Sequence, residues 1–282
     1  MKILPLSLAF VVFAFCNVPL AHSQTLAADY QVQDTFNSSV GSIGPLTIVG
    51  PTGGVTFQSD TVNGNPQQVL NIQASNTTPP FDESGVQTQT NPFLSASNYS
   101  IVLLANFNLN TADVVATKIF DFKNLSSDAG LYVNAASGTL AFIDGSGILQ
   151  GTGGAALSSL TYAQIVLTRD SSTNLTSVYL NGTLAFSFTD NVGLAVLGDS
   201  SMSGNSFLTL FKDDGMGLGG SILSESTQGN LARLRLYDGV LSPTDVMNLD
   251  TTIPEPSTYL LCVVGTIALL LTRIVARYRR GA

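Results

Sequence analysis

Two adjacent carboxylates, Asp213 and Asp214, have types and spacing suited to binding a cation. They follow an apolar stretch, and Glu225 comes shortly before a second one. Carboxylate oxygens on a loop are the ligands that a hard cation such as calcium prefers. The sequence therefore predicts a candidate calcium site at Asp213, Asp214 and Glu225. A solvated acidic turn between two strands is the competing interpretation.

The central part of the chain lacks the residues of most catalytic sites. The one histidine, His22, and the two cysteines, Cys16 and Cys262, lie in the terminal segments, and tryptophan is absent. This composition excludes zinc sites, Cys–His nucleophiles and Ser-His-Asp triads from the centre. Glycoside hydrolysis needs two carboxyl groups beside one bond, but the central glutamates, Glu83 and Glu225, lie far apart. We predict no catalytic residue.

Charge is sparse and acidic. Without Lys2, Glu255 and the C-terminal arginines, the 19 acidic and 11 basic residues become 18 and 6, a formal charge of −12 for residues 24–253. Nucleic-acid binding requires a basic face, so this class of partner is excluded. Sugars often stack on aromatic rings, and the candidates, which are also typical strand residues, are Tyr99, Tyr132, Tyr162, Tyr179 and Tyr237.

Short β-rich runs separated by Gly, Asn, Asp and Ser fill residues 24–253, as is typical of a sandwich or barrel. The clearest pair lies within 163–189, where Asn181-Gly182 predicts a tight hairpin turn. Val178 and Leu180 alternate with polar residues before this turn. After it, Leu184, Phe186 and Phe188 show the same period of two, which predicts one face of each strand in a core.

Two stretches carry a resemblance to a known fold. Val-Leu-Thr-Arg-Asp and Ser-Val-Tyr-Leu-Asn-Gly-Thr-Leu, within 166–184, resemble the central hairpin of laminin G-like and concanavalin A-like lectin/glucanase domains. Residues 229–246 resemble their closing strand, with Leu-Ser and a short helical turn. The resemblance implies an all-β, two-sheet antiparallel jelly-roll sandwich. Several relatives bind calcium at the sandwich rim, so calcium is the one cofactor that we consider.

The N-terminus has the composition of a secretory signal peptide. Lys2 supplies a positive start, 4–15 is apolar, and Ala21 and Ser23 are small residues at the positions that favour cleavage before Gln24. A retained membrane anchor is the alternative. We predict export across the inner membrane.

The C-terminus combines three features in a fixed order. Pro-Glu-Pro-Ser is followed by an uncharged apolar run over 259–271 and then by basic residues that favour the cytoplasmic side. The run is short for a full membrane span, which needs roughly 20 residues. These features lie at Pro254, Glu255, Pro256 and Ser257, and at Arg273, Arg277, Arg279 and Arg280.

This triplet resembles the PEP-CTERM sorting signal of Gram-negative bacteria. The resemblance implies recognition by an exosortase, a membrane-embedded transpeptidase, and removal of a transient inner-membrane helix near Pro-Glu-Pro. It also implies a role at the cell surface or in the extracellular matrix, linked to exopolysaccharide or biofilm.

The predicted organisation follows from both resemblances. It consists of a signal peptide (1–23), a laminin G-like β-sandwich (24–250), a linker with the sorting motif (251–257), a transmembrane helix (258–275) and an Arg-rich tail (276–282). We predict an exported, exosortase-processed, non-enzymatic surface or matrix protein with a lectin-like domain. The alternative is a lectin module with a specific carbohydrate or calcium ligand, and a glucanase-type hydrolase is the least favoured.

Intact mass tests the sorting prediction. In an exosortase-positive cell, the protein is expected to lose its C-terminal helix near Pro254-Glu255-Pro256, because a short helix followed by arginines suits a transient anchor. Fractionation and mass spectrometry of the native protein would show the truncated chain outside the inner membrane. An uncut helix in such a cell would contradict the prediction.

Overall fold

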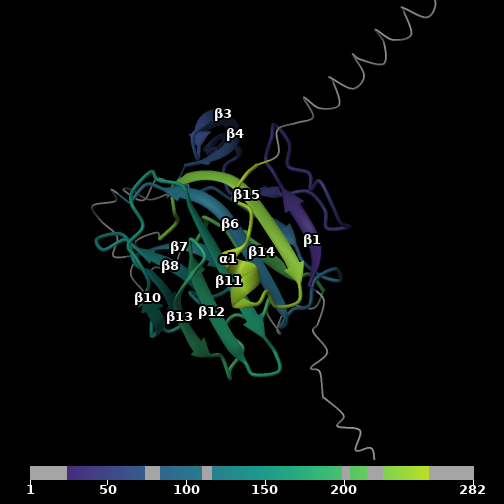
Figure 1. Ribbon diagram of the computed structural model, residues 1–282, viewed down its shortest axis with the longest axis vertical. Helices are drawn as coiled ribbons and strands as arrows, with labels where there is room; N and C mark the ends of the chain where they lie inside the picture. The colour runs from purple at the N-terminus through teal and green to yellow at the C-terminus, as the bar shows by residue number, and fades with distance from the viewer. Residues whose placement is uncertain (1–23, 74–82, 110–115, 199–203, 215–224, 254–282) are drawn as a thin grey trace, which may run out of the picture.

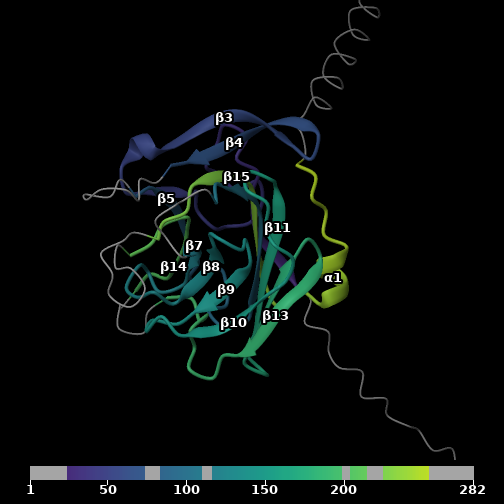
Figure 2. The same cartoon turned by 90° about the vertical axis from the view of Figure 1, so that its left-hand side faces the viewer.

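A computed structural model describes residues 24–73, 83–109, 116–198, 204–214 and 225–253. The predicted signal peptide, the Pro254–Ser257 motif, the 258–275 helix and the C-terminal arginines lie outside these residues. Among the described residues, no helix is long and apolar enough to span a bilayer. Two antiparallel sheets face one another in these segments, as Figure 2 shows in side view. The predicted all-β sandwich is confirmed.

The first sheet has eight strands within the described residues. Its order is β13-β12-β11-β6-β15-β4-β3, and β1 pairs with β15 beside β4. Figure 1 views this sheet from outside, with β15 and β6 at its centre. The strands are β1 (Thr25–Tyr30), β3 (Val55–Val62), β4 (Asn65–Ile72), β6 (Tyr99–Phe107), β11 (Ala163–Asp170), β12 (Leu175–Leu180), β13 (Thr183–Thr189) and β15 (Gly229–Asp238).

The second sheet has seven strands within the described residues, in the order β10-β9-β8-β7-β14-β5-β2. Its central strand β7 is buried along its whole length. The strands are β2 (Thr47–Val49), β5 (Gly85–Gln89), β7 (Ala116–Asp121), β8 (Gly130–Asn134), β9 (Leu140–Ile143), β10 (Leu149–Gly153) and β14 (Phe207–Leu210).

The core lies between the two sheets and is built from alternate residues of each strand. Ile101 and Leu103 on β6 face inward and are fully buried. Phe142 on β9 meets Phe188 on β13 across the interface, with 4.7 Å between the ring centroids. Removing these apolar surfaces from water is the main force that holds the layers together.

The hairpin predicted around Asn181-Gly182 is confirmed, but one residue that was predicted to face the core faces outward. Asn181 and Gly182 have φ of +48° and +79°, as a tight turn between two strands requires. Phe186 and Phe188 are buried, but Leu184 is 52% exposed. The pairing of β12 and β13 shifts beside Val178. This bulge turns Leu184 to the outer face.

The chain after β15 covers part of the outer face of the first sheet. The short helix α1 (Pro243–Met247) begins at Ser242, which exchanges capping hydrogen bonds with Asp245. Its Val246 is fully buried against Val102 and Val166 of the sheet. Figure 2 shows α1 on the side of this sheet that faces away from the second sheet.

A buried arginine joins three distant parts of the chain. Arg233 on β15 donates to both carboxylate oxygens of Asp29 on β1, each at 2.8 Å. It also donates to the carbonyl of Thr252, while Arg235 donates to that of Asp250 at 2.7 Å. Burial works to raise the pKa of Asp29, but the bonds and charge of Arg233 outweigh it and hold that pKa below 3.8.

Breaking this pair is expected to destabilise the domain. Asp29→Asn leaves the buried Arg233 without its counter-ion and should cost about 3–5 kcal/mol of unfolding free energy at pH 7 in urea titrations. Because the folded pKa of Asp29 is lowered, its contribution is present above pH 3.8 and is lost as the pH falls through the folded pKa.

The control for this change is Asp144→Asn, which alters a carboxylate in the turn between β9 and β10. It should cost much less than Asp29→Asn. If Asp29→Asn were as stable as the wild type, the stabilising role of the Arg233–Asp29 ion pair would be refuted.

Candidate functional site

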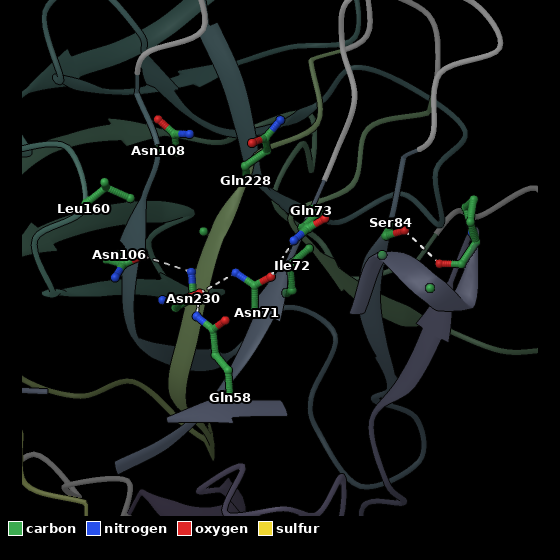
Figure 3. A pocket seen from close by; sticks show the side chains of 14 residues that line it. Gln58, Asn71, Ile72, Gln73, Ser84, Asn106, Asn108, Leu160, Gln228 and Asn230 are labelled. Carbon is green, nitrogen blue, oxygen red and sulfur yellow. Dashed lines mark hydrogen bonds between the residues drawn. The ribbon is translucent and has the colours of Figure 1, made fainter. Parts of the chain in front are cut away.

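A polar cavity of about 610 Å³ opens where β3, β4, β15 and β6 end. Strand β3 follows the short 3-10 helix η1 (Thr52–Gly54), which forms one wall. Figure 3 shows the amide side chains that gather there. The lining residues are Pro51, Gly53, Gly54, Gln58, Asn71, Ile72, Gln73, Ser84, Asn106, Asn108, Leu160, Gln228, Gly229 and Asn230.

The amides come from a repeated spacing on neighbouring strands. Residues two apart on a strand point to the same face, and three strands each supply one amide, with a second amide at this spacing just beyond the end of the strand. The pairs are Asn71 in β4 and Gln73 after it, Asn106 in β6 and Asn108 after it, and Asn230 in β15 and Gln228 before it. Since β6, β15 and β4 are neighbours, the pairs converge at one end of the outer face.

Asn230 is the centre of the hydrogen-bond network (Figure 3). Its Oδ1 accepts from Asn71 Nδ2 at 2.7 Å and from Gln58 Nε2 at 3.2 Å. Its backbone N–H donates to Asn106 Oδ1 at 3.0 Å. Gln73 Nε2 extends the chain of amides to Asn71 Oδ1 at 3.1 Å. These bonds fix the orientation of each amide before any ligand arrives.

Asp60 also belongs to this hydrogen-bond network. Its Oδ2 accepts from Asn230 Nδ2 at 2.8 Å and from the Tyr162 hydroxyl at 2.7 Å. Partial burial works to raise the pKa of Asp60, but the bonds from Tyr162, Thr61 and Asn230 outweigh it and lower that pKa. Burial and the neighbouring Asp60 raise the pKa of Tyr162. Asp60 therefore stays ionised and Tyr162 stays protonated at neutral pH.

The cavity lining is uncharged. None of the described residues that line it is an acid, a base, a histidine or a cysteine. Its amides each offer donors and an acceptor, and Ile72 and Leu160 add apolar surface. Such a lining can hydrogen-bond a neutral, hydroxyl-rich ligand.

A second cluster, of acidic residues around Lys118, lies on the second sheet. Lys118 is fully buried on β7, with its Nζ 2.9 Å from Asp213 Oδ1 and 3.3 Å from Asp121 Oδ2. Its Nζ also lies 5.4 Å from the Tyr132 ring centroid. Burial works to lower the pKa of Lys118, but the charges of Asp213 and Asp121 outweigh it and raise that pKa.

The structure brings two of the three predicted calcium ligands together. Carboxylate oxygens of Asp213 and Asp214 lie within 4.8 Å of one another and of Asp128, which the sequence did not suggest. Glu225 is not a member of this group, although its carbonyl accepts from the Lys118 N–H at 2.7 Å. Burial, then the charge of Asp214, raises the pKa of Asp128 to about 6.

The tyrosines suggested for sugar stacking lie outside the cavity. Tyr99 and Tyr132 are fully buried, and Tyr179 packs under Leu241 and Val246. Tyr162 joins the network through Asp60 and through Asn230 itself, but it does not line the cavity. The sequence reasoning missed the amide pairs, although Asn-x-Gln, Asn-x-Asn and Gln-x-Asn were visible as a repeated signal.

Comparisons with known proteins agree with this architecture. The family model described as the concanavalin A-like lectin/glucanases superfamily matches residues 81–247. No curated protein sequence matches the chain.

Among solved structures, the chain is similar to domain 4 of AbnA, a GH43 extracellular arabinanase from Geobacillus stearothermophilus, in complex with arabinotriose. The TM-score is 0.53 at 18% identity, over 80% of this chain and 98% of that one. It is also similar to the binding domain of botulinum neurotoxin DC, in complex with rat synaptotagmin II or with SialylT. There the TM-score is 0.51 at 11% identity, over 80% of this chain and half of the toxin domain. At identities this low, the TM-scores show a shared fold alone.

An isosteric change at the network centre is expected to weaken the fold in a pH-dependent way. Asn230→Asp places a buried carboxylate against Asp60 and should cost about 1–3 kcal/mol at pH 7, measured by urea unfolding. Repulsion raises the folded pKa of the carboxylate pair. The variant should therefore approach wild-type stability at low pH and lose it as the pH rises through that folded pKa.

Asn63→Asp, in the exposed turn between β3 and β4, is the matched control and should show little of this dependence. A pH-independent loss in Asn230→Asp would contradict the described contact with Asp60.

Proposed function

This chain belongs to the concanavalin A-like lectin/glucanases superfamily, and we propose that its domain is an exported module that binds neutral glycans in the amide-lined cavity. The observation that carries the proposal is the set of pre-oriented amides around Asn230. This reading favours the second of the functions predicted from the sequence, a lectin module with a specific ligand.

Three properties of the cavity support a carbohydrate ligand. Sugar hydroxyls donate and accept hydrogen bonds, as side-chain amides do. The amides are held by one another and by Asp60, so ligand binding costs little side-chain conformational entropy. The described lining carries no charge that would compensate a phosphate or a carboxylate, which favours an uncharged sugar.

The same lining supports binding without hydrolysis. Glycosidases place two carboxyl groups about 5–9.5 Å apart across the scissile bond. Asp60 is the nearest described carboxylate of the network, and its Oδ2 is engaged by Asn230 and Tyr162. The proposal therefore describes a binding protein rather than an enzyme.

Structural neighbours support this choice of ligand class. The arabinanase domain was captured with arabinotriose and a toxin binding domain with SialylT. The arabinanase domain is matched over 98% of its length, whereas the toxin binding domain is matched over half of its length. We extend saccharide binding to this chain as part of the proposal, chiefly from the arabinanase domain.

The cellular setting that we propose rests on the two termini. The signal peptide and the Pro254-Glu255-Pro256 motif support export and processing by an exosortase, with a transient inner-membrane anchor. The processed domain would reside at the surface or in the matrix of a Gram-negative bacterium. Its ligand there would be a neutral exopolysaccharide, which links the cavity to biofilm.

A glycan array probed with the full chain in mild detergent tests the proposal. Binding to neutral polysaccharides is expected. Gln58→Ala and Gln73→Ala, which remove exposed amides and spare the bond between Asn71 and Asn230, should each weaken binding about 5-fold or more, the equivalent of one hydrogen bond of about 1 kcal/mol.

Gln150→Ala, which removes an amide on β10 of the other sheet, is the control and should bind as the wild type does. An array without any neutral-glycan signal would end the proposal. Glycan binding that stays as strong in Gln58→Ala and Gln73→Ala as in the wild type would also end the proposal.

A further inference from the structure

We infer that Asp128, Asp213 and Asp214 form a calcium site on the outer side of the second sheet. This site is separate from the amide cavity, and the inference goes beyond glycan binding. Asp213 and Asp214 follow β14 and the buried Phe211, and Asp128 lies two residues before β8 begins. Strand β7, which carries Lys118, lies between β14 and β8.

The spacing of the oxygens suits calcium. One carboxylate oxygen from each of the three residues lies within 4.8 Å of the other two. Oxygens on one calcium ion lie at about 2.3–2.6 Å from it, so two of them are separated by at most about 5 Å. Magnesium demands near-ideal octahedral geometry and keeps several of its waters, whereas calcium accepts irregular sets of protein oxygens. A group of three protein carboxylates therefore suits calcium better than magnesium.

Asp128 is a buried carboxylate that lacks a hydrogen-bond partner. Its side chain is 8% exposed, and its buried Oδ1 accepts no hydrogen bond from any described residue. A buried polar group without a partner costs free energy, and a charged one costs more. Since this carboxylate faces Asp213 and Asp214, a cation between the three is the partner that the position lacks.

Asp213 supplies a second oxygen of this kind. Its side chain is fully buried, and its Oδ2 has no hydrogen-bond partner within the described segments. Lys118 Nζ lies beside the other oxygen, Oδ1. Lys118 therefore leaves one oxygen of Asp213 available, and we assign Lys118 the role of a positioning residue.

The charges of the cluster also favour an added cation. Lys118 contributes one positive charge against the carboxylates of Asp121, Asp128, Asp213 and Asp214, which leaves a formal charge of −3 when all are ionised. Calcium would reduce this excess to −1. Lys118 pairs directly with Asp121 and Asp213, so its charge is directed mainly at those two carboxylates.

Calcium titration of the full chain in mild detergent tests the inference. Calorimetry with CaCl2 should show one site with Kd on the order of 10⁻⁴–10⁻³ M, the range of extracellular calcium modules. The Tm should rise with millimolar CaCl2 relative to EGTA, and MgCl2 should raise it less. The isosteric variants Asp128→Asn and Asp214→Asn should each raise the Kd about tenfold or more, because each removes a ligand charge.

Asp170→Asn, in the turn between β11 and β12, is the matched control and should keep the wild-type Kd and Tm shift. The wild-type titration does not depend on whether any variant folds. Absence of heat and of a Tm shift in the wild type would overturn the inference. Equal shifts with magnesium, or an unchanged Kd in both Asp128→Asn and Asp214→Asn, would overturn it as well.

Discussion

The alternation of side chains along each strand is the constraint on which this structure depends. Every second residue of a strand must enter the core, so the remaining residues form the outer faces. On β6, Ile101 and Leu103 fill the core while Asn106 reaches the cavity. On the second sheet, the same constraint places Lys118 and Tyr132 outward, beside the acidic cluster. Both candidate sites are built from the outer halves of strands whose inner halves hold the sandwich together.

Local patterns in the sequence predicted much of the fold. The hairpin at Asn181-Gly182 was predicted from its turn residues, and the short helical turn after Leu-Ser from the resemblance of residues 229–246; both occur in the structure. Leu184 was predicted inward and lies outward, because the bulge beside Val178 depends on how two strands pair. Periodicity within one strand contains no such information.

The candidate sites were less predictable than the elements that carry them. Asn71, Asn106 and Asn230 meet only because β4, β15 and β6 are neighbours, and strand order is a property of the whole chain. Asp128 joins Asp213 for the same reason. Adjacent acids such as Asp213 and Asp214 are visible in a sequence, whereas a third ligand from the connection between two other strands is not.

Buried ion pairs connect parts of the described chain that are far apart in sequence. The described segments contain no cysteine, and buried pairs join residues far apart in sequence, such as Arg233 with Asp29 and Lys118 with Asp213. The pair of Arg233 with Asp29 requires an ionised carboxylate, and the folded pKa of Asp29 is lowered, so this contact loses its contribution to stability in acid.

The contacts of Arg233 and Arg235 with the residues after α1 also decide how the domain would bear mechanical tension. A pull on the chain beyond Ile253 acts first on Thr252 and Asp250, and through the two arginines on β15. Strand β15 pairs with β6 along its length and with β1 and β4 on its other edge. The ladders on both edges of β15 therefore share the load. Force applied at this end would therefore pass through the first sheet, and the acidic cluster on the second sheet would lie outside the path of the load.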